Sequence, residues 1–159
     1  MKKKIWTPLL LLAVLVLAVS LRLRPRTLEQ VTGFAPDDLT GLSASVREGG
    51  VSNGVLYSDS YKLPSLTPED EAFFELLTLT ESFRFRPSLC PFLRDSVNTN
   101  SMKYLSLLLT AGEDFSWLSI YDNGKVLMHV SGGFLIYYLT DLEAYEPLVS
   151  YIKTHGEKT

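Results

Sequence analysis

The pattern of hydrophobic and polar positions changes twice along the chain. Residues 5–21 carry no charge and include an unbroken apolar run from Leu9 to Val19. Residues 27–40 contain turn-forming and polar residues, which indicates a linker. From residue 41 onward, short apolar segments alternate with turn residues, as expected for one globular domain. The pattern therefore predicts an export or membrane segment over 1–26, a linker over 27–40 and a single domain over 41–159.

Residues 1–26 have the features of a signal anchor or a signal peptide. The 17 uncharged residues follow a lysine cluster, and as a helix they span roughly 25 Å, at the short edge of what crosses a bilayer. Ala18 and Ser20 would suit a cleaved signal peptide. Arg22, Arg24 and Arg26 can lie among lipid headgroups and favour an uncleaved anchor. We expect a single-pass protein of the cell membrane, anchored through residues 5–21 with its C-terminal domain outside; the alternative is secretion after cleavage.

The first half of the domain predicts a hairpin followed by a helix. Leu42, Ala44 and Val46 alternate with polar residues as a half-buried strand does, and Val55–Lys62 can return as its partner. Thr67 is the expected helix N-cap and Pro68 the first helical residue. The buried stripe of this helix is Phe73, Phe74, Leu76, Leu77 and Thr80.

The second half predicts a four-stranded antiparallel meander and a closing helix. The expected strands are Lys103–Thr110, Phe115–Tyr121, Lys125–Val130 and Phe134–Leu139. Thr140 and Glu143 have capping-box spacing, and Pro147 predicts a kink or a fresh helix start. The expected buried face of this helix is Leu142, Tyr145, Leu148, Val149 and Ile152. The chain therefore predicts an α+β fold, β-β-α-β-β-β-β-α, with an antiparallel sheet, two packing helices and an N-terminal membrane helix.

The strand register decides which side chains share a face of the sheet. If Thr110 pairs with Phe115, one face holds Leu105, Leu107, Leu109, Leu118 and Ile120. A two-residue Asn123-Gly124 turn would add Leu127 and His129 to that face, whereas a turn with Gly124 as a bulge would add Val126, Met128 and Val130. We prefer the second register because it keeps Lys125 and His129 out of the core. Continued through Ser131–Gly133, it adds Phe134, Ile136 and Tyr138.

The opposite face is then apolar as well, a pattern typical of sheets covered on both faces. Its candidate residues are Tyr104, Leu108, Trp117, Leu127, His129, Leu135 and Tyr137. The two helices can cover only one face. Either residues 30–62 fold over the other face, or it is an exposed aromatic groove that binds a peptide or another envelope protein.

Charge is unevenly distributed along the chain. Six of the 15 basic residues lie in the first 26 residues, which contain no acidic residue. The remaining nine face all 18 acidic residues, so the chain from Thr27 onward has a net charge of −9. Such a domain repels phosphate backbones and anionic lipid surfaces. We therefore expect no nucleic-acid binding, and a cationic or neutral partner.

The sequence contains no recognisable catalytic or metal-binding motif. It lacks glycine-rich phosphate loops, a Gly-x-Ser-x-Gly motif and a His-Glu-x-x-His motif. A hydrolase would have to use His129 as its base, since His155 lies in a polar tail. The single cysteine, Cys90, is expected to be a small buried hydrophobe, and the acidic pairs lie in expected turns. We predict no catalytic residues, no metal and no cofactor.

Several segments resemble a family of uncharacterised, small exported or membrane-anchored domains of Gram-positive bacteria. They are Tyr104-Leu-Ser-Leu-Leu-Leu, Trp117-Leu-Ser-Ile-Tyr-Asp-Asn-Gly-Lys-Val, Gly133-Phe-Leu-Ile-Tyr-Tyr-Leu and the closing series Leu142, Tyr145, Leu148, Tyr151 and Ile152. The resemblance starts at Pro64, and it implies an extracytoplasmic domain of unassigned function with no catalytic residues to transfer. We thus expect a tethered domain that binds or senses a protein, peptide or envelope component. The alternatives are an envelope hydrolase and an immunity-like protein that blocks a partner.

Overall fold

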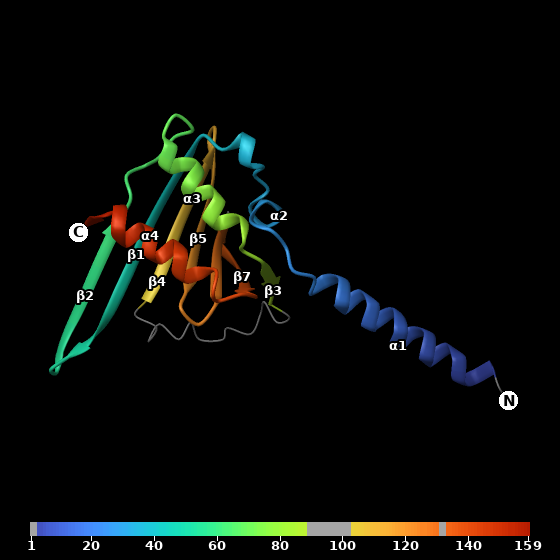
Figure 1. Ribbon diagram of the computed structural model, residues 1–159. Helices are drawn as coiled ribbons and strands as arrows, with labels where there is room; N and C mark the ends of the chain where they lie inside the picture. The colour runs from blue at the N-terminus through green and yellow to red at the C-terminus, as the bar shows by residue number, and fades with distance from the viewer. Residues whose placement is uncertain (1–2, 89–102, 131–132) are drawn as a thin grey trace.

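One antiparallel sheet, covered on one face by helices, forms the body of the protein (Figure 1). The computed structural model describes residues 3–88, 103–130 and 133–159. The helices are α1 (Lys3–Arg22), α2 (Leu28–Thr32), the 3-10 helix η1 (Pro36–Asp38), α3 (Glu71–Glu81) and α4 (Tyr145–His155). The strands are β1 (Gly41–Ser52), β2 (Val55–Lys62), β3 (Phe85–Pro87), β4 (Lys103–Ala111), β5 (Asp114–Tyr121), β6 (Lys125–Val130), β7 (Gly133–Leu139) and β8 (Glu157–Lys158). The predicted α+β class with an antiparallel sheet is confirmed.

The strands form a single eight-stranded sheet in the order β3-β7-β6-β5-β4-β1-β2-β8. The predicted hairpin is β1–β2, and the predicted meander is β4 to β7. Pairing of β1 with β4, which places Val46 opposite Leu105, joins these two units into one sheet. The short strands β3 and β8, which pair with β7 and β2, were not predicted.

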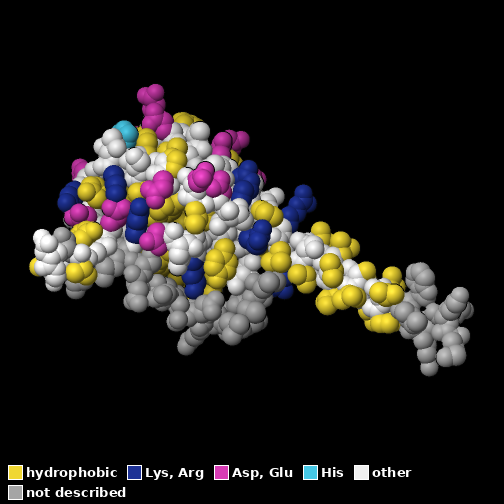
Figure 2. Space-filling view, turned by 60° about the horizontal axis from the view of Figure 1, so that its bottom comes forward, with side chains coloured by type: hydrophobic (Ala, Val, Ile, Leu, Met, Phe, Trp, Pro, Cys, Tyr) yellow, Lys and Arg dark blue, Asp and Glu magenta, His cyan; other side chains and the backbone are white. Residues whose placement is uncertain are grey.

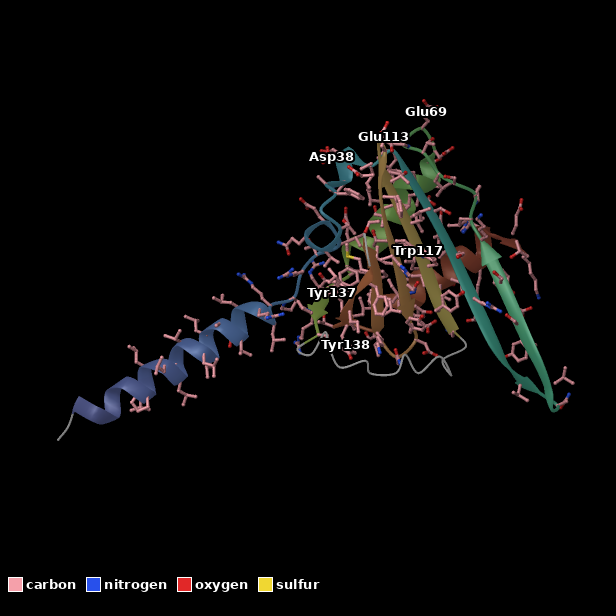
Figure 3. The ribbon with its side chains drawn as sticks, turned by 180° about the vertical axis from the view of Figure 1, so that it is seen from behind. Asp38, Glu69, Glu113, Trp117, Tyr137 and Tyr138 are labelled. Atoms are coloured by element: carbon pink, nitrogen blue, oxygen red, sulfur yellow. The ribbon has the colours of Figure 1, made fainter. Side chains whose placement is uncertain are left out.

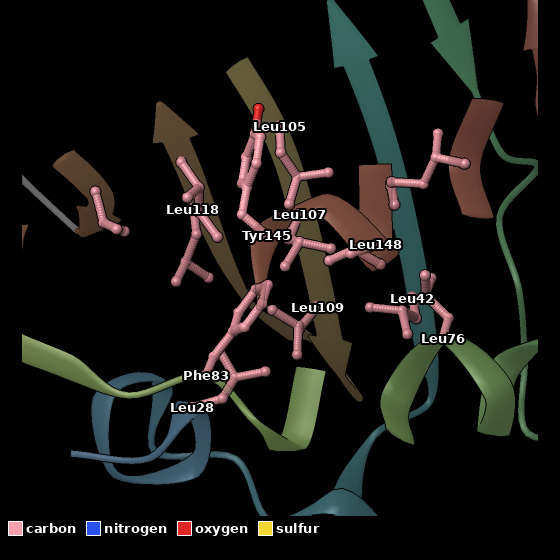
Figure 4. Packing of buried hydrophobic residues seen from close by; sticks show 14 of the residues in the cluster. Leu28, Leu42, Leu76, Phe83, Leu105, Leu107, Leu109, Leu118, Tyr145 and Leu148 are labelled. Atoms are coloured by element: carbon pink, nitrogen blue, oxygen red, sulfur yellow. The ribbon is translucent and has the colours of Figure 1, made fainter. Parts of the chain in front are cut away.

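The hydrophobic core lies between the sheet and helices α3 and α4 (Figure 4). Side chains from β1, β4 and β5 meet Leu76 of α3 and Leu148 of α4, and both leucines are fully buried. Leu28 and Val31 of α2 join the same core. The predicted linker over 27–40 is therefore partly structured, because Thr27 and Gln30 form a capping box that starts α2.

Both long helices of the domain begin later than predicted. Asp70, not Thr67, is the residue before α3, and its carboxylate accepts hydrogen bonds from the Thr67 backbone (2.7 Å) and hydroxyl (3.0 Å). These bonds close a turn that keeps Pro68 outside the helix. Helix α4 starts at Tyr145, so Pro147 lies in its first turn, where no helical hydrogen bond is lost. The capping box at Thr140 is wrong, because the Thr140 hydroxyl donates to the Arg84 carbonyl instead.

The predicted helix stripes match the core with two exceptions. Tyr145, Leu148, Val149 and Ile152 are buried, as are Phe73, Leu76 and Thr80. Phe74 and Leu142 are about half exposed, at 55% and 48%. Phe74 follows the buried Phe73 on α3, whereas Leu142 precedes α4 and is not part of the helix.

The registers of the first two meander hairpins are as predicted. Thr110 pairs with Phe115, and Leu107 with Leu118, so their leucines share the helix-covered face. Gly124 has a φ of +80°, and Met128 pairs with Leu118, which places Met128 in the core and His129 on the other face. The preferred turn with Gly124 as its left-handed residue is therefore confirmed.

The predicted register of the last hairpin is wrong by one residue. Gly133 pairs with Val130, and Tyr137 with Val126, so strand β7 begins one residue earlier than expected. A slip of one residue exchanges the two faces of a strand. Tyr137 therefore enters the core at 6% exposure, whereas Phe134, Ile136 and Tyr138 point away from the helices.

Helix α1 projects from the domain, and its side chains face outward (Figure 2). Its large aliphatic side chains from Leu9 to Leu21 are between 40% and 68% exposed. Across residues 3–88, 103–130 and 133–159, length and hydropathy together identify no membrane-spanning helix.

Candidate functional site

The sheet face opposite α3 and α4, which we name the outer face, carries an exposed apolar row (Figure 3). Strand pairing aligns Leu108, Trp117, His129 and Phe134 across β4, β5, β6 and β7. Leu108 is 38% exposed, Trp117 42% and Phe134 52%. Adjacent residues on the same strands, such as Leu107 and Leu118, are fully buried on the helix side. The row is therefore a surface feature and not a second core.

The Trp117 ring is held in place by two contacts. It stacks on the His129 ring with 4.1 Å between centroids and 13° between planes. Its Nε1–H donates a 2.6 Å hydrogen bond to the Ser106 hydroxyl oxygen. A tryptophan fixed in this way loses little side-chain entropy when a partner packs against it. Large aromatic side chains of this kind carry much of the binding energy at protein interfaces.

The exposed row is one part of a face with varied exposure. Phe115, beyond the row on β5, is 66% exposed. Tyr104 and Tyr121 are half-buried neighbours, with ring centroids 5.8 Å apart. Leu127 and Ser119 are buried at 8% and 7% exposure. The accessible area is thus concentrated around Trp117, Phe134 and Phe115.

A shallow pocket lies beside Trp117, between β4, β1 and β2. Its lining combines polar and apolar residues, namely Ser43, Ala44, Ser45, Lys62, Ser106, Leu108 and Trp117. The serines can donate or accept hydrogen bonds, and the lysine supplies a positive charge. The pocket can therefore hold a polar or anionic group next to an apolar one.

Five of the seven predicted face residues lie on the outer face. They are Tyr104, Leu108, Trp117, Leu127 and His129. Placement of Leu135 and Tyr137 on this face is wrong, because Met128 and Val126 pair with them on the helix side. Phe134 and Ile136 take those places.

Residues 30–62 do not fold over the outer face. Residues 41–62 extend the sheet sideways as β1 and β2, and Val31 and Leu39 pack into the core on the helix side. The expectation that this segment covers the outer face is therefore wrong.

Several residues of the outer face were not predicted from the sequence. The strand register places Phe115 and Phe134 on the outer face. The position of Phe115 could have been predicted, because the expected pairing of Thr110 with Phe115 already assigns it to this face. Arg47 and Lys62 also lie there, in register with Tyr104 and Ser45. The alternation Leu42, Ala44, Val46 assigns odd-numbered residues of β1 to the other face, which was the available signal for Arg47.

Catalysis by His129 lacks its required neighbours in the described part of the chain. No carboxylate or hydroxyl among those residues hydrogen-bonds to the ring, which is half-buried against Trp117. The described residues also contain no group of three or more His, Cys, Asp or Glu side chains placed to hold a metal ion. Cys90 lies outside the described residues. Among the described residues, the stacked rings of Trp117 and His129 therefore form part of an exposed contact surface.

Ion pairs gather on the helix side of the sheet. Glu48 pairs with Lys153 at 2.6 Å and with Lys103 at 3.3 Å, and Lys103 also reaches Glu146 at 3.2 Å. Burial alone would raise the pKa of Glu48, but the hydrogen bonds and charges of the two lysines lower it overall. Burial raises the pKa of the nearby Tyr145 hydroxyl, so this tyrosine stays neutral. This cluster ties α4 to β1 and β4.

No family model, curated protein or solved structure matches this chain. The resemblance to small exported domains of Gram-positive bacteria stays a prediction.

Proposed function

We propose that this protein is a membrane-tethered, extracytoplasmic domain that binds a protein or peptide through the outer face of its sheet. The observation that carries the proposal is the exposed row of Leu108, Trp117 and Phe134 on the face that no described helix covers. Burial of this row by a partner would remove apolar surface from water, which is the main driving force of protein association. Stacking on His129 already orders the tryptophan for such a contact.

The tether is helix α1. Its large aliphatic side chains from Leu9 to Leu21 are 40% to 68% exposed, and a lipid environment would bury them. Arg22 and Arg24 directly follow the apolar run and can reach lipid headgroups. A hydrophobic segment slightly shorter than the bilayer is accommodated by local thinning and by such flanking residues.

Co-purification from detergent-solubilised membranes tests the binding part of the proposal. We expect a partner to co-purify with the full-length protein and to be lost from a Trp117→Ser variant. Phe74→Ser is the matched control, because Phe74 is a similarly exposed aromatic residue, at 55%, on the helix side. Equal retention of the partner by both variants would contradict the proposal, provided that both remain folded by circular dichroism.

Carbonate extraction and intact-mass analysis test the tether. We expect the protein to stay in the membrane fraction and to keep the mass of the uncleaved chain. A soluble protein that has lost the mass of its first 20 or so residues would show that the segment is a cleaved signal peptide.

A further inference from the structure

The outer face has a charge opposite to that of the domain as a whole. From Thr27 onward, 18 acidic residues face nine basic ones. On strands β1 to β7, the described outward positions hold no Asp or Glu, but they hold Arg47, Lys62, Arg86 and Lys125. The nearest acidic residue in the strand register is Glu157 on the edge strand β8, opposite Lys62. Positive charge is therefore concentrated on the same face as the exposed aromatic row.

Three of these basic side chains are exposed and have no ionic partner among the described residues. Arg47 donates from Nε to the Ser58 hydroxyl at 3.0 Å, and neither it nor Lys62 or Arg86 forms an ion pair with a residue that the structure describes. On the helix side and the adjacent edge of the sheet, by contrast, Lys103, Lys153 and Lys158 all pair with carboxylates. Lys125, the fourth basic residue, is buried at 7% exposure and is not accessible to a partner.

The exposed cations lie on the same face as the apolar row, displaced toward one end of the strands. Tyr104 and Tyr138, the register partners of Arg47 and Arg86, are four residues from Leu108 and Phe134. Lys62 lines the pocket beside Trp117. Arg86 lies on β3 at one edge of the sheet, in register with Tyr138, and Arg47 lies on β1 next to Tyr104. Five strand spacings separate β1 from β3 in the sheet order, which amounts to roughly 24 Å. A peptide of about eight extended residues covers this distance.

We propose that the partner presents an acidic segment to this face. The inference rests on the proposed function and adds the chemistry of the partner. Apolar side chains of the segment pack against Leu108, Trp117 and Phe134, while its carboxylates pair with Arg47, Lys62 and Arg86. Arginine is suited to this because its guanidinium group binds a carboxylate in a bidentate manner. The expectation of a cationic or neutral partner followed from the negative net charge of the domain. The local charge of the outer face is positive, and it therefore favours an acidic partner.

An anionic lipid surface would also suit exposed cations, but the orientation of the face favours a protein. In Figure 3 the outer face points to the viewer, while α1 runs across the picture. If α1 crosses the bilayer in this arrangement, the outer face points along the membrane and not into it. A neighbouring protein meets such a surface more readily than the anchoring bilayer does.

Selection from a display library of random 12-residue peptides tests this inference. The full-length protein is presented in nanodiscs of neutral phosphatidylcholine. Selections run in parallel on the wild type, on the triple variant Arg47→Glu, Lys62→Glu, Arg86→Glu, and on the double variant Trp117→Ser, Phe134→Ser. Lys158→Glu is the matched charge reversal on the helix side, where Lys158 is exposed. Circular dichroism and urea midpoints establish that each variant is folded.

We expect the wild type and the Lys158 variant to select acidic peptides with aromatic or aliphatic residues. These peptides should bind the triple variant more weakly than the wild type. Each of its three substituted cations should account for about a two- to fivefold loss of affinity, because exposed ion pairs contribute modestly. The affinity should also fall as salt is raised from 0.05 to 0.5 M, which shortens the screening length.

Three other results would overturn the inference, and they differ in what they say of the proposed function. Neutral or basic peptides that bind the triple variant equally well, but not the double variant, would leave the proposed function intact and remove the acidic partner. If the selected peptides bind the wild type, the triple variant and the double variant equally well, both the acidic partner and the proposed function are contradicted. Binding of phosphatidylglycerol vesicles that the triple variant loses, without selection of acidic peptides, would identify a lipid surface as the partner.

Discussion

Two adjacent leucines on β4 offer a direct comparison of the two sheet faces. Leu107 is fully buried between the sheet and the helices, and it pairs with Ala44 and Leu118. Leu108, the next residue, is 38% exposed on the outer face. The same substitution, Leu→Ala, removes the same atoms from two surroundings on one strand. The difference in unfolding free energy then reports how well each face is packed.

The surroundings of each leucine determine the expected loss of unfolding free energy. Leu107→Ala loses the burial of three carbon atoms and leaves a cavity, which together cost about 3–4 kcal/mol. Leu108→Ala loses part of its burial and leaves a surface that water fills, at a cost of about 1 kcal/mol. Both residues lie in the same strand, so the change in β-propensity from Leu to Ala is the same in the two variants and cancels in the comparison.

Urea denaturation of the full-length protein in mild detergent, followed by intrinsic fluorescence, measures both free energies. We expect the two midpoints to differ clearly at an unchanged denaturant slope. A loss of stability for Leu108→Ala as large as that for Leu107→Ala would refute the reasoning. It would show that the outer face is packed as tightly as the core and is not a free surface.

Three further predictions concern register, pH and the turn between β5 and β6. Tyr137→Ala should destabilise the protein by about 3 kcal/mol and Tyr138→Ala by about 1 kcal/mol, because only the first side chain is in the core; a reversed order in urea denaturation would restore the register expected from sequence. Glu48→Gln should lower the urea midpoint at pH 7, and the difference from the wild type should shrink as the pH falls below the ordinary pKa of 4.5. The pKa of Glu48 is depressed in the folded protein, so its contribution is present above the unfolded pKa and is lost as pH falls through the folded one; a difference that does not change as the pH is lowered would contradict the ion pair with Lys153 as its source. Gly124→Ala should cost about 1–2 kcal/mol because of its φ of +80°, as measured by thermal unfolding, and an unchanged midpoint would argue against the left-handed turn.

The parts of the fold that could be predicted depend on local signals. The meander turns are specified by residues such as Gly112 and Gly124, which adopt positive φ values of +62° and +80°. The period of alternating residues in β4 and β5 then assigned Leu107 and Leu118 to the core. The turns and the strand faces depend on residues that are close together in the chain, so they can be predicted from the sequence.

The last hairpin could not be assigned in the same way. Strand β7 reads Gly-Phe-Leu-Ile-Tyr-Tyr-Leu, and it is apolar at both odd and even positions. Its sequence therefore shows no preference for either face. The connection Ser131-Gly132-Gly133 is compatible with a turn of two or three residues, and the choice between them moves Tyr137 from one face to the other.

Long-range arrangements were also beyond the reach of the sequence. Pairing of β1 with β4 joins segments about 60 residues apart, and no local pattern specifies it. The cationic character of the outer face depends on this pairing, because it brings Arg47 beside Tyr104. A face assembled from distant strands has a local charge that the composition of the chain does not reveal.

Site-specific photo-crosslinking in native membranes tests the central claim most directly. A benzophenone amino acid replaces Phe134 on the outer face in one variant of the full-length protein and Phe74 on α3 in another. The two side chains have similar exposure, 52% and 55%, so chance collisions should label both equally. We predict a discrete crosslinked species of defined mass from position 134 that position 74 does not give. Equal labelling from both positions, or a discrete product from position 74 alone, would contradict an outer face that binds a partner.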